Sequence, residues 1–275
     1  MKEPTGVSSW EGPSARGAVL ILLAHQDDEI AFSQLIAVVR EQGRPVRVVY
    51  LTNGGAGPQA PARRAAESVR ALVALGVPRS EIRFLGTDLS IPDGELVRHL
   101  SSAYRALLDD CRSIGDLGAL LTLAWEGGHP DHDATHVLAI KLARERGADD
   151  RTWQVPFYRA ADHGPPFFSM FAPLGCNGPV QELPEARAGA LLRARMIRFY
   201  PSQWRAFAGL GPAIFWHALV GTPSKVQKVP VHRTLERPTA GPLLYERRYH
   251  ISFAEFAERA NNFLEESEAG RSIRS

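Results

Sequence analysis

The sequence predicts a Rossmann-like three-layer α/β/α sandwich with a mostly parallel sheet and a smaller, irregular C-terminal part. Short β-rich apolar runs alternate with amphipathic helical stretches between about residues 18 and 158, which is the rhythm of successive βαβ units. The first run, residues 19–23, is apolar without alternation, as in a parallel strand buried on both faces. The 275 residues are 44% hydrophobic and 23% charged, which excludes disordered and fibrous classes and suffices for one large core.

The expected core consists of five strands joined by helices. Strands are expected at residues 19–23, 46–51, 82–85, 119–123 and about 153–157. Apolar residues at helical spacing predict helices at about 30–43, 64–75, 96–108 and around 137–142. Because parallel strands are joined by right-handed crossovers, the expected order is 3-2-1-4-5, with the first and fourth strands side by side.

The two ends of the chain have weaker patterns. Residues 1–17 are polar and rich in Gly, Pro and Ser, so we expect a disordered or extended segment. Residues 159–275 are expected to belong to the same domain as the core. Within them, 159–180 is predicted to be a long functional loop, and 183–198 a helix. The chain is expected to close with a helix at 252–266, which opens with a Ser-x-x-Glu capping box.

Composition excludes several classes of protein. The two cysteines, Cys111 and Cys176, lie far apart, which fits a reducing compartment and a cytoplasmic location. The apolar run at 19–24 is too short for a signal peptide or a membrane span. A formal net charge of +2 argues against a nucleic-acid partner.

A first motif, residues 25–29 (HQDDE), follows the first strand and opens the first helix. Acidic residues also stabilise the first turn of a helix, so the acids alone do not indicate a site. His25 changes the balance, because a histidine flanked by carboxylates stands where parallel α/β sheets bind ligands.

A second motif, residues 128–132 (GHPDH), follows the fourth strand, and His136 stands one helical turn further on. A single histidine at a turn is usually an ordinary polar residue. Three histidines and two aspartates between His129 and His136 offer imidazoles that can bind a metal and carboxylates that can orient them.

The expected strand order brings the two motifs to one crevice, because the connections leaving the first and fourth strands diverge to opposite faces of the sheet. Histidine and aspartate from one loop and histidine from the other make three nitrogen and oxygen ligands. Such a set suits zinc with one position open for water, which is the arrangement of a catalytic site.

Together the two motifs resemble those of the zinc-dependent de-N-acetylases called the LmbE-like or PIG-L family. The resemblance extends over about residues 18–147, and residues 200–203 (YPSQ) are also familiar. Gln26 stands where the family more often has proline, which bears on loop rigidity rather than on metal binding. The resemblance implies that the protein binds Zn²⁺ or another divalent metal. It also implies a reaction, the removal of an N-acetyl group, and a small-molecule partner, an N-acetylglucosamine-type sugar or sugar conjugate.

Carried over residue by residue, the resemblance makes His25, Asp28 and His132 the zinc ligands. It makes Asp27 the general base, and His129 the group that stabilises the oxyanion or protonates the leaving amine.

The roles of the neighbouring residues are less specific. Asp131 is expected to orient His129. Glu29 is expected to stabilise the first turn of the helix, and His136 to pack in the core or support a ligand. Arg64 either binds the acyl end of the substrate or is an exposed helical arginine.

Aromatic residues near the motifs are expected to bind substrate. Phe167 and Phe168 lie in the Pro-, Gly- and Phe-rich segment after the fifth strand, which forms either a lid over the crevice or a hydrophobic plug. Trp125 either walls the pocket or belongs to the core.

Three other functions compete with de-N-acetylation. The same zinc site suits an amidase or esterase acting on another acylated small molecule. A nucleotide-binding protein would use the glycines of residues 54–57, but these lack the G-x-G-x-x-G spacing and a P-loop lysine. A metal-binding scaffold without catalysis has no need of Asp27 and His129 beside the ligands.

Overall fold

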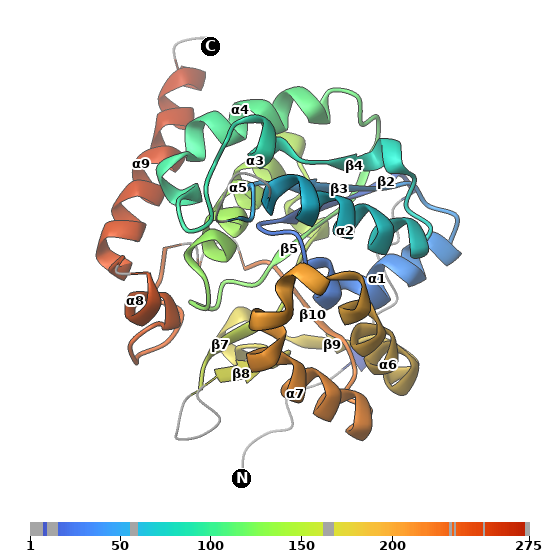
Figure 1. Ribbon diagram of the computed structural model, residues 1–275. Coiled ribbons are helices and arrows are strands. Elements are labelled where there is room, and N and C mark those ends of the chain that lie inside the picture. The colour runs from blue at the N-terminus through green and yellow to red at the C-terminus, as the bar shows by residue number, and fades with distance from the viewer. Residues whose placement is uncertain are drawn as a thin grey trace.

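An eight-stranded sheet forms the centre of the computed structural model, with helices on both sides (Figure 1). The structure describes residues 8–9, 16–55, 60–161, 168–230, 233, 235–249 and 251–272. The strand order is β1-β9-β10-β6-β5-β2-β3-β4. Its strands are β1 (Ser8–Ser9), β2 (Ala18–Leu23), β3 (Val46–Tyr50), β4 (Ile82–Arg83), β5 (Leu117–Leu123), β6 (Thr152–Val155), β9 (Val180–Glu182) and β10 (Lys225–Lys228).

Helices cover both faces of this sheet because its central strands are apolar on both sides. In β2, Val19, Ile21 and Leu23 belong to one hydrophobic core, and Leu20 and Leu22 to the other. The first core takes side chains from α1 (Glu29–Glu41), α2 (Ala60–Ala74), α6 (Ala186–Met196) and α7 (Trp204–Val220). The second takes them from α3 (Leu85–Asp88), α4 (Leu100–Cys111), α5 (Pro130–Arg146) and α9 (Phe253–Ser272). The short helix α8 (Leu244–Arg248) precedes α9.

The parallel part of the sheet confirms the predicted fold class and strand order. In sequence order, the strands β2, β3, β4, β5 and β6 are the five that were expected, and they are arranged 3-2-1-4-5 with parallel pairing throughout. β2 and β5 are neighbours, so the loops that leave their carboxyl ends flank the same crevice.

The C-terminal part adds strands that the sequence did not predict. β10 pairs antiparallel with β6, β9 pairs antiparallel with β10, and β1 pairs parallel with β9. The prediction of a loop over 159–180 was wrong in part, because β7 (Tyr158–Ala160) and β8 (Phe168–Met170) form a separate antiparallel hairpin there. The strands β7, β8, β9 and β10 have three or four residues and mixed polarity, so they are too short for a period-2 pattern to stand out.

The predicted helices occur with shifted boundaries. The third expected helix is divided at His99, after a 3-10 turn at Leu96–Arg98 and before α4. The closing helix α9 is confirmed, and the Oγ of Ser252 accepts the Glu255 N–H at 3.1 Å, as the capping box requires. Within the part of the chain that the structure describes, no helix combines the length and apolarity needed to cross a membrane.

Candidate metal centre and substrate cavity

The loops after β2 and β5 bring the two sequence motifs into contact. Nε2 of His132 lies 3.1 Å from Oδ1 of Asp28, and Nδ1 of His25 lies 3.7 Å from Oδ2 of the same carboxylate. The candidate ligand atoms of these three buried residues all lie within 4.8 Å of one another. His25 and His132, which are more than 100 positions apart along the chain, therefore share the Asp28 carboxylate.

The Asp28 side chain is fixed by the loop from which it projects. Its Oδ2 accepts the backbone N–H groups of Ala24 at 3.0 Å and His25 at 2.7 Å. Burial alone would raise the pKa of Asp28, but His132 and His25 beside it hold that pKa well below its usual range. The carboxylate is therefore ionised, as a metal ligand must be.

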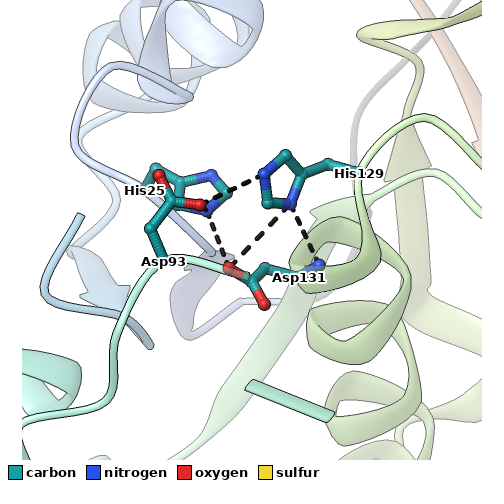
Figure 2. A group of neighbouring side chains, drawn as sticks. All are labelled: His25, Asp93, His129 and Asp131. Atoms are coloured by element: carbon teal, nitrogen blue, oxygen red, sulfur yellow. Dashed lines mark hydrogen bonds and ion pairs between the residues drawn. The ribbon is translucent and has the colours of Figure 1, made fainter. Parts of the chain in front are cut away.

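A second carboxylate orients His25. Its Nε2 is 2.9 Å from Oδ2 of Asp131, and the same carboxylate accepts the N–H groups of Gly94 at 2.6 Å and Leu96 at 2.9 Å. Figure 2 shows the Asp131 carboxylate below the rings of His25 and His129, with Asp93 drawn beside His25. A histidine that donates one ring nitrogen to a carboxylate keeps the other nitrogen bare for a metal. Nδ1 of His25 faces Asp28 and is therefore the nitrogen placed to bind a metal.

These residues fit a metal ion by their donor chemistry. Two ligands bound at about 2.0–2.1 Å in a tetrahedral site lie about 3.3 Å apart. The two N···O distances of 3.1 and 3.7 Å around Asp28 bracket that value. Two imidazoles and one carboxylate also match the three protein ligands of catalytic zinc sites.

A neighbouring group of potential ligands consists of His25, Asp93, His129 and Asp131. The oxygens of Asp131 already accept two backbone N–H groups and the His25 ring. Nδ1 of His129 accepts the Asp131 N–H at 3.1 Å, which caps α5. This group therefore forms a hydrogen-bonded support beside the His25–Asp28–His132 cluster.

His129 presents its other nitrogen to the cavity wall. Because Nδ1 accepts a hydrogen bond, the neutral ring carries its proton on Nε2, which lies 3.2 Å from Oδ1 of Asp93. Burial and the nearby His25 lower the pKa of His129 to about 4. The ring is therefore a neutral hydrogen-bond donor near pH 7.

Asp131 was expected to orient His129 through its side chain, but it holds His129 through its backbone N–H instead. The Asp131 carboxylate binds His25, and Oδ2 of Asp131 lies 3.9 Å from Nδ1 of His129.

Asp27 occupies a strained position beside the cluster. Its φ of 132° lies in a region that favours glycine, and such strain is characteristic of functional sites. The conformation is held from two sides: Oε2 of Glu29 accepts the Asp27 N–H at 2.9 Å, and Nη2 of Arg64 lies 3.1 Å from Oδ1 of Asp27. Burial raises the pKa of Asp27, with Arg64 acting in the opposite direction.

Arg64 and Glu29 are therefore both part of the site's framework. Arg64 is buried rather than exposed and also donates to the backbone oxygens of Gln26 and Gly54. Glu29 is fully buried and also accepts the hydroxyl of Tyr200, which lies in the sequence stretch 200–203.

A cavity of about 270 Å³ opens over these groups. One wall carries the polar residues His25, Asp27, Asp28, Arg64, Asp93 and His129. The other comes from the β7–β8 hairpin, α7 and the α8 region: Phe157, Tyr158, Phe168, Gln203, Arg205, Ala206, Phe207, Gly209, Leu210, Leu244, Arg248 and Tyr249. A volume of this size suits one sugar-sized group with part of its substituents.

One of the three aromatic residues predicted to bind substrate lines the cavity. Phe168 lines the cavity, whereas Phe167 lies outside the described residues. Trp125 is not among the described residues that line the cavity: it is buried against Phe253 and Phe256, and its indole N–H donates to the backbone of Glu236.

His136 is likewise a core residue. Its Nδ1 is 2.9 Å from the backbone oxygen of Leu123, and its ring packs against Trp125. This contact belongs to the packing of α5 on β5, and it matches the packing role that was one of two expectations for His136.

Two acidic residues near the centre were missed by sequence reasoning. Asp93 lies in a Pro-Asp-Gly stretch, which is the signature of an ordinary turn. Glu126 adjoins the second motif and is fully enclosed, where it accepts the N–H groups of Phe157 at 2.8 Å and Tyr158 at 3.0 Å. Burial raises the pKa of Glu126 to about 7. The available sequence signal for Glu126 was its position directly before Gly127 and Gly128, at the start of the second motif. The place of Asp93 near the centre is revealed only by its contacts in three dimensions.

Fold and centre together define an α/β protein with a candidate catalytic metal site at the carboxyl edge of a parallel sheet. Residues 20–143 match the family model described as PIG-L: GlcNAc-PI de-N-acetylase. The match confirms the resemblance drawn from the motifs over these residues.

Similar solved structures support the same fold. The A40926 pseudoaglycone deacetylase Dbv21 superposes with a TM-score of 0.58 at 19% identity, over 82% of this chain and 100% of that one. A deacetylase–teicoplanin complex gives 0.57 at 17% identity, over 77% and 98%. The zinc-inhibited form of the teicoplanin deacetylase Orf2 gives 0.55 at 18% identity, over 76% and 97%. A comparison with curated proteins found no match.

Proposed function

We propose that the protein is a metal-dependent hydrolase that removes the N-acetyl group from an N-acetylglucosamine-type sugar or sugar conjugate. The observation that carries the proposal is the position of Asp27 beside the His25–Asp28–His132 cluster, on the wall of one cavity. A ligand set, a base and a hydrogen-bond donor converging on a cavity are the parts that amide hydrolysis needs.

The metal is proposed to be zinc, held by His25, Asp28 and His132. A divalent ion bound there supplies Lewis acidity, which polarises the amide carbonyl and lowers the pKa of a coordinated water to about 7. The ligand set of two imidazoles and one carboxylate supports this choice of metal.

Asp27 is proposed to accept the proton of the attacking water. Its carboxylate lines the cavity, and the ion pair with Arg64 keeps it in one orientation. Arg64 in this proposal positions the base, and its place on the cavity wall also lets it contact the acyl end of the substrate.

His129 is proposed to stabilise the oxyanion. A neutral ring with its proton on Nε2 donates a hydrogen bond to charge that develops on the carbonyl oxygen. The same neutral ring is less suited to protonating the leaving amine, because that step needs an imidazolium. Asp27, which holds the proton taken from the water, is proposed to return it to the leaving nitrogen. Asp131 in turn keeps His25 in the orientation that leaves Nδ1 free.

The proposed substrate class draws on what similar proteins are described as doing. The family model is described as a de-N-acetylase of GlcNAc-PI, and the similar structures include a deacetylase of the A40926 pseudoaglycone and a deacetylase bound to teicoplanin. In this chain, Phe168, Phe207 and Leu244 give the outer wall an apolar character, which suits the face of a sugar or an attached aglycone.

An acetate-release screen tests the proposal. Purified protein, stripped of metal and reloaded with zinc, is incubated with N-acetylglucosamine, its glycosides and conjugates, and simple acetylated amines and esters. We expect release from at least one amino-sugar substrate, and loss of that release in Asp27→Asn. Turnover of acetate esters or longer amides alone would replace the proposal with an esterase or amidase that uses the same centre.

A further inference from the structure

The helix α7 exposes a large apolar face to solvent. Trp204, Phe215, Trp216, Leu219 and Val220 are between 54% and 71% exposed, and we call these five residues the α7 face. Trp204, Phe215 and Leu219 follow one stripe of the helix, because their spacings of 11 and 4 residues are near whole numbers of turns. Large apolar residues gathered on one surface indicate a binding site.

The buried side of α7 already has its packing partners. Phe207, Ile214 and Ala218 are buried beneath the helix, and Arg205 and Leu210 line the substrate cavity. The five residues of the α7 face are absent both from the buried residues of the helix and from the described residues that line the cavity. Figure 1 shows α7 on the outside of the molecule, next to α6.

The charge around the α7 face has one sign. Residues 186–220, which comprise α6, α7 and their connection, contain five arginines and neither aspartate nor glutamate. Four of these arginines are exposed: Arg187, Arg195, Arg198 and Arg205. Two of them lie over aromatic rings, Arg198 over Phe199 at 4.9 Å and Arg205 over Trp204 at 5.3 Å.

This combination favours an anionic lipid surface over a second copy of the chain. Tryptophan, phenylalanine and leucine beside basic residues are typical of helices that lie in the headgroup region of a bilayer. A twofold dimer through the same face would bring these arginines toward their own copies without an acidic residue of the segment to compensate them.

We propose that the α7 face docks the protein on an anionic membrane. Trp204, Trp216 and Leu219 enter the boundary between headgroups and acyl chains, and the four exposed arginines of residues 186–220 contact the lipid phosphates. The cavity shares α7 with this face, so a substrate held at the membrane would meet the cavity beside the lipid surface. The docking proposal does not depend on the proposed reaction.

Vesicle flotation tests the proposal with the full-length, zinc-loaded protein. The vesicles are phosphatidylcholine alone or an equimolar mixture of phosphatidylcholine and phosphatidylglycerol. We expect flotation with the anionic vesicles that weakens as salt is added, and little with the neutral ones.

Matched variants distinguish binding through the α7 face from non-specific adsorption to vesicles. W216S/L219S should reduce binding to anionic vesicles at least about tenfold, because two large apolar side chains leave the bilayer. V73S/L89S removes exposed apolar residues elsewhere and should bind as the wild type does. R187Q/R195Q should weaken binding about fivefold per arginine, whereas R79Q/R112Q, outside the segment, should not.

Two results would overturn the proposal. Equal binding by W216S/L219S and the wild type would remove the α7 face as the docking site. Absence of flotation, together with a concentration-dependent dimer that W216S/L219S abolishes, would assign the face to a second copy instead. Melting temperatures of the variants close to that of the wild type exclude misfolding as the cause of lost binding.

Discussion

The two walls of the cavity differ in how their side chains are held. On the inner wall, polar atoms have fixed partners: Asp28 accepts two backbone N–H groups, and Asp131 accepts two more besides the His25 ring. On the outer wall, Phe168 and Leu244 are half-buried, and Arg248 is exposed.

The walls also differ in origin. The inner wall comes mainly from two loops at the carboxyl ends of neighbouring parallel strands, where backbone geometry aims side chains at one point. The outer wall is assembled from a hairpin, a helix and a short helical turn that are far apart in the sequence. The difference supports the proposal that the inner wall carries out the chemistry, and we expect the outer wall to determine which molecule is held.

The largest effect is expected from Asp28→Ala. The variant removes the carboxylate shared by both histidines and exposes two N–H groups that it held, so metal and activity should be lost together. Metal analysis after gel filtration should fall from about one ion per chain to near none. Retention of the ion with unchanged affinity would contradict the ligand assignment and turn attention to Asp93 and His129.

The next largest effect separates base from ligand. Asp27→Asn keeps the size of the side chain and its contact with Arg64, but the amide cannot accept a proton. We expect kcat to fall ~100- to 10,000-fold while the metal content stays at the wild-type level. Near-normal turnover by the zinc-loaded variant would show that Asp27 is not the base.

The difference between the inner and outer walls also explains which parts of the site could be predicted from the sequence. The strand β2 is an unbroken apolar run, and β3 and β5 are mostly apolar. The two motifs directly follow β2 and β5, so their meeting follows from the rules of parallel sheets. Asp93 reaches the centre only because Asp131 binds the backbone of Gly94 and Leu96, which is a long-range contact without a local pattern.

The outer wall shows why the C-terminal part was harder to predict. α7 was missed because both its buried and its exposed sides are apolar, so it lacks the polar stripe that marks an amphipathic helix. β9 and β10 are too short to show alternation and are defined by their partners in the sheet.

The β7–β8 hairpin combines the two hypotheses made for its segment. Met170 and Phe171 are buried in the core, as a plug requires, whereas Phe168 on the same short strand lines the cavity. Phe168→Ala should therefore raise KM for a sugar conjugate about tenfold and change KM for free N-acetylglucosamine much less.

Met170→Ala is the matched control for Phe168→Ala. It removes a buried side chain from the same strand and should lower the free energy of unfolding by ~2–5 kcal/mol with little change in KM. If Phe168→Ala changed KM equally for both substrates, or only lowered the melting temperature, Phe168 would also belong to the hydrophobic plug.

The smallest effect concerns His136, which lies one turn beyond a proposed ligand but contacts only the core. Burial lowers the pKa of His136 to about 4, compared with about 6.5 in an unfolded chain. Between these pH values the unfolded chain binds a proton that the folded chain does not, so stability falls as the pH decreases from about 6.5 to 4 and is unaffected by this residue above that range. One such group changes the free energy of unfolding by at most ~1.4 kcal/mol per pH unit.

His136→Gln should remove that slope. Urea unfolding of wild type and variant at several pH values between 7.5 and 5 measures it, and the stability gap between the two proteins should narrow as the pH falls. His99→Gln, at an exposed position, should leave the pH dependence of the wild type unchanged. The His136 variant should also keep its metal, because Nδ1 of His136 is engaged with Leu123 and the residue is not part of the three-ligand cluster. Loss of the ion in His136→Gln, with parallel stability curves, would instead place this histidine in support of the inner wall.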